Sequence, residues 1–270
     1  MIADYQRSPE WDRLGERTKK DYRIDLGKVA AKFGTVPLVV FGDQKMRADV
    51  MAWRAEMAGK KAIVMLSTLL SWGVTEGKMR HNVATGIPML YSANRAVIIW
   101  TAEDMAAIEP HCSKELWQAI RLASMTGFRL GDLVDVGWQH VGLQSIVFVT
   151  AKRDKRVVIP VFAELRKLLD EIGGSEGTIL KNSRGQAWTE SGLGGVFQKA
   201  KAKAAGFNRE LRIHDLRGTY ATWLARKGLT DQEIARIVAW SEKQVAEIRR
   251  SYVDEEHVVT SLVARIEAIK

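Results

Sequence analysis

Apolar residues recur every three or four positions along most of the chain, the spacing that places them on one face of an α-helix. One such helix is predicted to begin with a cap at Thr18 and Asp21 and to end at Gly34, with apolar positions at Tyr22, Leu26, Val29 and Phe33. Ser8 and Pro9 predict an earlier helix start. Two more helices are expected over 45–58 and 60–75, which together indicate a helical bundle.

The helical pattern breaks over residues 82–100, where Gly86, Pro88 and Asn94 interrupt it. Such a stretch is typical of a connection between domains. We therefore expect a helical N-terminal domain over 1–92, a linker over 93–100 and a second domain over 101–270.

The second domain combines helices with one pair of strands. Residues 145–151 and 156–161 are rich in β-branched side chains and flank a charged tip, which predicts an antiparallel hairpin. A short helix or turn is expected at 128–136. The remaining apolar periodicity predicts helices at 102–109, 113–126, 162–172, 189–205, 214–227, 231–239, 242–250 and 255–269. The fold class is therefore mainly α with a small antiparallel β-sheet.

Charge narrows the choice of partners. The 270 residues hold 41 Lys and Arg against 32 Asp and Glu, a net charge of +9 and an isoelectric point near 9.6. This balance favours polyanions, and nucleic acid first among them. Lys60 and Lys61 stand at a predicted helix start, where a cation opposes the helix dipole unless an anion is near. They are equally consistent with a solvated pair and with phosphate contacts.

Several classes of protein are disfavoured. Cys112 is the only cysteine, which excludes a disulfide framework, and the histidines lack metal-ligand spacing. No apolar run approaches the roughly 18 residues of a membrane span, and the N-terminus lacks the apolar core of a signal peptide. We expect a soluble intracellular protein with no metal and no cofactor.

The stretch 211–253 carries the most distinctive chemistry. His214 and Arg217 are three residues apart, a spacing that would put both side chains on one helical face. Thr230 with Glu233, and then Ser241, are expected to cap the next two helices. Tyr252 follows at the end. An Arg-His pair with a late tyrosine suggests a phosphate site and a nucleophile brought to it.

Motifs on either side of this stretch extend the pattern. They are TGFRLGDLVDVGW, the hairpin with Lys152, HDLRGTYATWLARKG and AWSEKQVAEIRRSY, in this order. Over roughly 100–270 the chain resembles the tyrosine recombinase (phage integrase) family. The resemblance implies a catalytic domain here, preceded by a helical core-binding (SAM-like) domain that binds DNA.

The resemblance also implies roles for individual residues. Arg129 and Arg217 match the two catalytic arginines, and His214 matches the histidine of the second arginine's motif. Asp132 falls at a position that supports the site. Lys152 matches the lysine at the hairpin tip, where Arg153 and Lys155 are its rivals. Trp240 stands where most members have histidine and some have tryptophan, and Tyr252 matches the nucleophile.

This residue set suits phosphodiester chemistry. Two guanidiniums can neutralise the nonbridging oxygens with fixed geometry, so an attacking oxygen is not repelled. Tyr252 would form a 3′-phosphotyrosine, Lys152 would protonate the leaving 5′-oxygen, and His214 would assist. Trp240 can only donate a hydrogen bond. The arginines supply the positive charge that a metal would otherwise bring.

The implied partner is double-stranded DNA, gripped by both domains, with Lys60, Lys61 and Arg153 as candidate contacts. A homotetramer on DNA is expected, with exchange of a C-terminal helix whose apolar stripe holds Val258, Val259, Leu262 and Ile266. Such an integrase of a phage or other mobile element would work in the cytoplasm, at the bacterial nucleoid. An arm-binding N-terminal domain, common among such integrases, is not recognisable in this chain, which points to a simple recombinase or a truncated one.

Two alternatives share part of this pattern. A type IB topoisomerase uses the same chemistry without exchanging DNA partners, and the compact N-terminal bundle argues against it. A DNA-binding module that has lost cleavage would not need the full set of Arg129, Lys152, His214, Arg217 and Tyr252.

Overall fold

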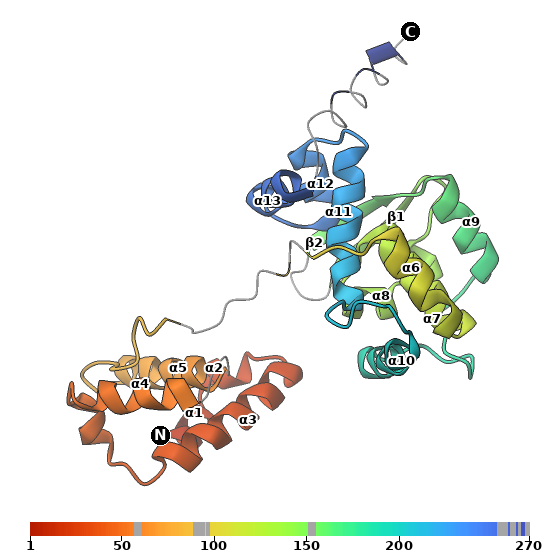
Figure 1. The fold of residues 1–270 in the computed structure, drawn as a ribbon. Coiled ribbons are helices and arrows are strands. Elements are labelled where there is room, and N and C mark those ends of the chain that lie inside the picture. Colours follow the sequence, from red (N-terminus) through yellow and green to blue (C-terminus); the bar gives the residue numbers. More distant parts are fainter. Residues whose placement is uncertain are drawn as a thin grey trace. The chain divides into compact units, whose positions relative to one another are not determined.

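The computed structural model describes residues 1–56, 61–88, 95, 98–150, 155–252, 259, 263 and 266–267. The chain divides into two compact units, Met1–Ala93 and Asn94–Lys270 (Figure 1). Each unit has an apolar core of its own.

The first unit is entirely helical within its described residues. Its elements are α1 (Ile2–Tyr5), α2 (Pro9–Asp12), α3 (Glu16–Phe33), the 3₁₀ helix η1 (Leu38–Gly42), α4 (Met46–Glu56) and α5 (Ala62–Thr75). Phe33 packs edge-on against Trp53 of α4 and Phe41 of η1. Ser8 caps α2 as predicted. The cap predicted at Thr18 is wrong, because α3 already begins at Glu16 after Gly15.

The second unit holds the remaining elements. In chain order they are α6 (Ala102–Ile108), η2 (Glu109–His111), α7 (Lys114–Thr126), α8 (Leu130–Asp135), η3 (Trp138–His140), β1 (Ser145–Thr150), β2 (Lys155–Pro160), α9 (Ala163–Ile172), α10 (Glu190–Lys203), η4 (Ile213–Asp215), α11 (Leu216–Arg226), α12 (Asp231–Val238) and α13 (Glu242–Tyr252). The cap predicted at Thr230 is present as a capping box, and Thr101 forms another at the start of α6. The predicted class, mainly α with a small antiparallel sheet, is confirmed.

Strands β1 and β2 form the antiparallel hairpin, with a register that runs from Ser145 opposite Pro160 to Thr150 opposite Lys155. Inward side chains alternate with outward ones, so Ile146 and Phe148 of β1 face the core together with Val157 and Ile159 of β2. Residues 151–154, which include the predicted tip, lie outside the described part of the chain.

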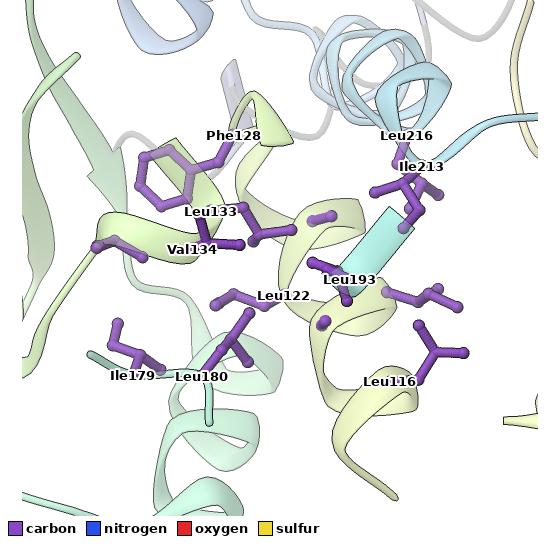
Figure 2. Packing of buried hydrophobic residues seen from close by; sticks show 14 of the residues in the cluster. Leu116, Leu122, Phe128, Leu133, Val134, Ile179, Leu180, Leu193, Ile213 and Leu216 are labelled. Carbon is purple, nitrogen blue, oxygen red and sulfur yellow. The ribbon is translucent and has the colours of Figure 1, made fainter. Parts of the chain in front are cut away.

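Two apolar clusters build the second unit. The larger one unites α6 to α10 with the hairpin, and Figure 2 shows its centre, where Leu122 of α7, Leu133 of α8 and Leu193 of α10 meet. The smaller cluster joins α11, α12 and α13. Helix α11 belongs to both, because Leu216 packs in the larger cluster while Tyr220 and Leu224 pack in the smaller one.

Among the helices of the described residues, none combines the length and apolarity that crossing a bilayer requires.

Gly127 ends α7 in the left-handed conformation, with φ of 61°. A β-carbon at this position would lie 2.8 Å from Cδ1 of Tyr220, which is completely buried on α11. Both the backbone and the close approach of α11 therefore require glycine here. The same turn leads through Phe128 to Arg129, so the backbone conformation of Gly127 helps to determine the position of Arg129.

We expect Gly127→Ala to lower the free energy of unfolding by about 2 kcal/mol or more, because left-handed strain and overpacking add. The matched control is Gly195→Ala on α10, where a β-carbon would meet nothing within 4 Å. That change should raise stability by about 0.5–1 kcal/mol, since alanine favours helix. Urea denaturation measures both, and a neutral Gly127→Ala would contradict the packing argument.

Candidate active site

Arg129 stands at the N-cap of α8, directly after the turn that ends α7. Its Nη1 is buried and lies 3.6 Å from Oδ2 of Asp132, one helical turn later, whose side chain is 3% exposed. No described residue makes a hydrogen bond to that nitrogen. The Asp132 carboxylate thus lies within ion-pair distance of the Arg129 guanidinium. Burial, together with the charges of Asp132 and Glu190, raises the pKa of the nearby Asp135.

Arg217, the second residue of α11, is the most buried arginine of the site, with 4% exposure. Its Nη1 donates to the carbonyl of Gly127 at 2.5 Å, so the guanidinium reaches the turn that precedes Arg129. On another side the guanidinium carbon lies 5.3 Å from the centroid of the Trp240 ring. Arg217 therefore joins the α7–α8 turn to the segment between α12 and α13.

Trp240 is half-buried and occupies the connection that leaves α12. The preceding Ala239 is left-handed, with φ of 47°, and it is the only described residue other than glycine with a positive φ. The N–H of Trp240 then donates to the carbonyl of Ala235, which closes the helix end. This termination turns the indole toward Arg217, where its electron-rich face can stabilise the cation.

His214 lies in the 3₁₀ turn η4, ahead of α11 rather than on it, and its side chain is exposed. The predicted helix over 214–227 therefore begins two residues late, and the histidine and Arg217 have different surroundings. Asp215, between them, is 3% exposed.

Tyr252 is the last residue of α13 and is half-buried. Its carbonyl accepts a hydrogen bond from Nη2 of Arg226 at 3.2 Å. One turn earlier, Arg249 binds Asp231 at 2.7 Å and the Leu229 carbonyl at 2.6 Å, which ties α13 to the start of α12. Arg226 ends α11, about 13 Å along the helix from Arg217. The tyrosine backbone and the buried arginine thus attach to opposite ends of α11.

A basic groove of about 470 Å³ opens beside Trp240. Lys155 and Arg156 of β2 line one part of it, and Arg236 of α12 lines another. Sequence reasoning did not single out Arg156 or Arg236. Arg236 lies in the last turn of α12, four positions before Trp240 in the sequence, and this closeness in sequence is the signal that could have identified it.

Other predicted residues fall elsewhere. Lys152, Arg153 and Lys60 lie outside the described residues. Lys61 is exposed at the N-cap of α5 in the first unit. Arg129, Asp132, Arg217 and Trp240 are the predicted site residues that the contacts above bring together.

Groups suited to other chemistry are few. In the described part of the chain, no three His, Cys, Asp or Glu side chains gather as a metal site. Burial raises the pKa of Cys112 to about 11, which suppresses its thiolate. Burial likewise raises the pKa of Tyr220 far above its ordinary value, so that hydroxyl is unsuited to nucleophilic attack.

Comparison with known proteins confirms the predicted class, the tyrosine recombinases. A model of the phage integrase family matches residues 99–256, and the chain belongs to that family. The integrase of Mycobacterium phage D29 is 25% identical over 219 residues, which are 69% of this chain. The match spans 58% of the length of that phage protein.

Solved structures share the fold. A lambda integrase (75–356) dimer bound to a COC′ core site superimposes with a TM-score of 0.77 and 21% identity, covering 93% of this chain and 95% of that one. A lambda integrase tetramer bound to a Holliday junction superimposes with a TM-score of 0.78 and 20% identity, and the match covers 94% of this chain and 77% of that one. The Tn1549 transposon integrase in complex with circular intermediate DNA superimposes with a TM-score of 0.69 and 14% identity, and the match covers 98% of this chain and 97% of that one.

Proposed function

We propose that this protein is a site-specific DNA recombinase, an integrase that cleaves and rejoins DNA through a 3′-phosphotyrosine intermediate without metal or nucleotide. The observation that carries the proposal is the buried Arg217, which reaches the turn before Arg129 and lies against Trp240. Two arginines from different elements suit the two nonbridging oxygens of one phosphate. Family membership over residues 99–256 supports the same reaction.

The arginines act where negative charge grows. As oxygen attacks the phosphorus, charge accumulates on the nonbridging oxygens of the five-coordinate transition state. Guanidiniums held in advance stabilise that charge without reorganising. Arg217 is suited to this task because the Gly127 carbonyl and the Trp240 ring already hold its orientation. Asp132 holds Arg129 in the same way from one helical turn away.

The covalent step transfers the phosphoryl group to the protein. The phenolic oxygen of Tyr252 loses its proton and bonds to phosphorus while the P–O5′ bond breaks. Lys152 donates a proton to the leaving 5′-oxygen, and the exposed His214 assists proton transfer or holds a phosphate oxygen. A 5′-hydroxyl from another strand then reverses the step, which restores the tyrosine and completes the exchange.

Double-stranded DNA is the proposed partner, with the first unit as the core-binding domain and Lys61 and Lys60 among its phosphate contacts. In the second unit, the groove lined by Lys155, Arg156 and Arg236 offers the basic surface that a DNA backbone requires. Arg153 is a further candidate contact. At work on DNA in a bacterial host, the protein would be found at the nucleoid.

A homotetramer on DNA, with exchange of the C-terminal helix, is the proposed assembly. Val259 and Ile266 of the predicted stripe are exposed, and Val263 between them is exposed as well. Val258 and Leu262 lie outside the described residues. Exposed apolar residues at helical spacing favour docking on another protomer.

Tyr252→Phe should abolish covalent trapping on a nicked suicide duplex that carries the crossover site, because the variant lacks the attacking oxygen. The trapped adduct is measured as a slower band on a denaturing gel. Tyr220→Phe is the matched control, since its buried hydroxyl hydrogen-bonds to no described residue and its loss should leave trapping intact.

The results of the adduct assay distinguish a recombinase from a DNA-binding module and from a topoisomerase. A wild-type protein that binds the duplex but never forms an adduct would be a DNA-binding module. A protein that forms the adduct and relaxes supercoiled plasmid, yet never transfers a strand to a second duplex, would be a topoisomerase.

Trp240→Ala should slow adduct formation about 2- to 30-fold, the equivalent of the roughly 0.5–2 kcal/mol that a cation over an aromatic ring contributes. Trp240→Phe retains an aromatic face, so its rate of adduct formation should fall less than that of Trp240→Ala. Single-turnover rates on the suicide duplex decide the question, and unchanged rates for Trp240→Ala would assign the indole to packing alone.

Excess EDTA should leave the rate of adduct formation unchanged, because the arginines supply the positive charge at the phosphate. Parallel reactions with EDTA and with added Mg²⁺ test this expectation. A requirement for the divalent ion would contradict the proposed chemistry.

A further inference from the structure

Three consecutive carbonyls before η4 are held by side chains from two segments, the start of the second unit and α10. Nη2 of Arg95 donates to the Glu210 carbonyl at 2.8 Å, and Nζ of Lys201 donates to Leu211 at 2.7 Å. The indole N–H of Trp100 donates to the Arg212 carbonyl at 3.0 Å. This segment leads directly into the turn that carries His214.

Arg95 makes a second, stronger contact with the same region. Its Nη2 lies 2.6 Å from Oδ2 of Asp215, and its Nε lies 3.2 Å from Oδ1, a bidentate ion pair. The Asp215 side chain is 1% exposed and that of Arg95 is 23% exposed. Oδ2 of Asp215 also accepts the N–H of Arg212 at 2.8 Å, which closes the turn. One guanidinium thus holds both ends of a six-residue segment.

Asp215 stands between two of the proposed catalytic residues, His214 and Arg217. His214 precedes it, and Arg217 follows two positions later as α11 begins. The Asp215 carbonyl accepts from the Thr219 hydroxyl, and that hydroxyl accepts the N–H of Trp100 at 2.8 Å. The start of α11 is therefore fixed to residues 95 and 100, at the beginning of the second unit.

The charged side chains around Lys201 and Asp215 are mostly positive. Burial, followed by the positive charges of Arg212, Arg209 and Arg95, lowers the pKa of Lys201, and Asp215 opposes this effect. Asp215 is thus the carboxylate that offsets several cations. An uncharged side chain at position 95 would leave this carboxylate without its bidentate partner.

We propose that Arg95 is a positioning residue for the phosphate site, because it fixes the turn that carries His214 and Arg217 through Asp215 and the Glu210 carbonyl. It lies at the beginning of the second unit, 120 residues before Asp215 in the sequence. This inference rests on the proposed function for its effect on catalysis. The effect on the turn is independent of that function.

The test compares full-length wild type with Arg95→Ala on the nicked suicide duplex at saturating DNA. Because small misplacements of catalytic groups are costly, single-turnover adduct formation should fall about 10- to 100-fold. DNA affinity should change by less than about threefold, the loss expected from at most one phosphate contact. Hydrogen exchange without DNA should accelerate at amides 211–219 and remain unchanged in α7.

A conservative substitution and an added guanidinium ion distinguish a positioning role of Arg95 from a general effect on the stability of the fold. Arg95→Lys keeps the charge but not the bidentate geometry, so it should recover only part of the rate. Free guanidinium ion at nondenaturing concentration should raise the rate of Arg95→Ala, while equal NaCl should not. Asp215→Asn should slow the reaction, and the double variant with Arg95→Ala should add little further loss.

Arg166→Ala is the matched control, since Arg166 also holds two loop carbonyls, those of Gly142 and Leu143, at 2.6 and 2.9 Å. It should leave adduct formation unchanged. A wild-type rate for Arg95→Ala would overturn the inference, as would a loss confined to DNA binding. A loss that follows only global unfolding, without rescue by lysine or guanidinium, would overturn it too. Should wild type itself form no adduct, the proposed function fails and hydrogen exchange at 211–219 alone decides the role of Arg95.

Discussion

The site depends on one buried guanidinium that joins two apolar clusters. Arg217 projects from α11, whose residues pack in both clusters of the second unit. It donates to Gly127, between Ala123 and Phe128 of the larger cluster, and lies against Trp240 beside the smaller one. A cation so little exposed is costly unless polar or aromatic partners surround it. Those partners fix its position, which is what a preformed phosphate site requires.

Two helices end in left-handed residues beside the contacts of this guanidinium. Gly127 ends α7 two positions before Arg129, and Ala239 ends α12 directly before Trp240. Ala239 bears a steric cost of about 1–2 kcal/mol that glycine would avoid. Strained conformations persist where the surrounding packing determines them, and they often accompany function. At Ala239 the strained residue ends α12 directly before Trp240, whose ring lies against Arg217.

The helix that carries Tyr252, the proposed nucleophile, is held differently from Arg217. Polar contacts from Arg226 and Arg249 attach the last turn of α13 to the C-terminal end of α11 and the start of α12. These groups are exposed or partly exposed, so their contacts are weaker than those inside the core. In the proposed reaction, a firmly held Arg217 and a lightly held tyrosine helix suit a nucleophile that engages after DNA binds.

Most helix positions and the cap at Thr230 followed from the sequence, because periodicity and capping depend on neighbours within four residues, whereas the cap expected at Thr18 and the helix start expected at His214 did not. The contacts that assemble the site did not, since Arg217 meets Gly127 across 90 residues and Arg95 meets Asp215 across 120. Sequence motifs nominated Arg129, Asp132, Arg217 and Trp240. Only the tertiary structure brought them together, placed His214 in a turn ahead of its helix, and revealed Arg95, because long-range packing decides which distant residues meet.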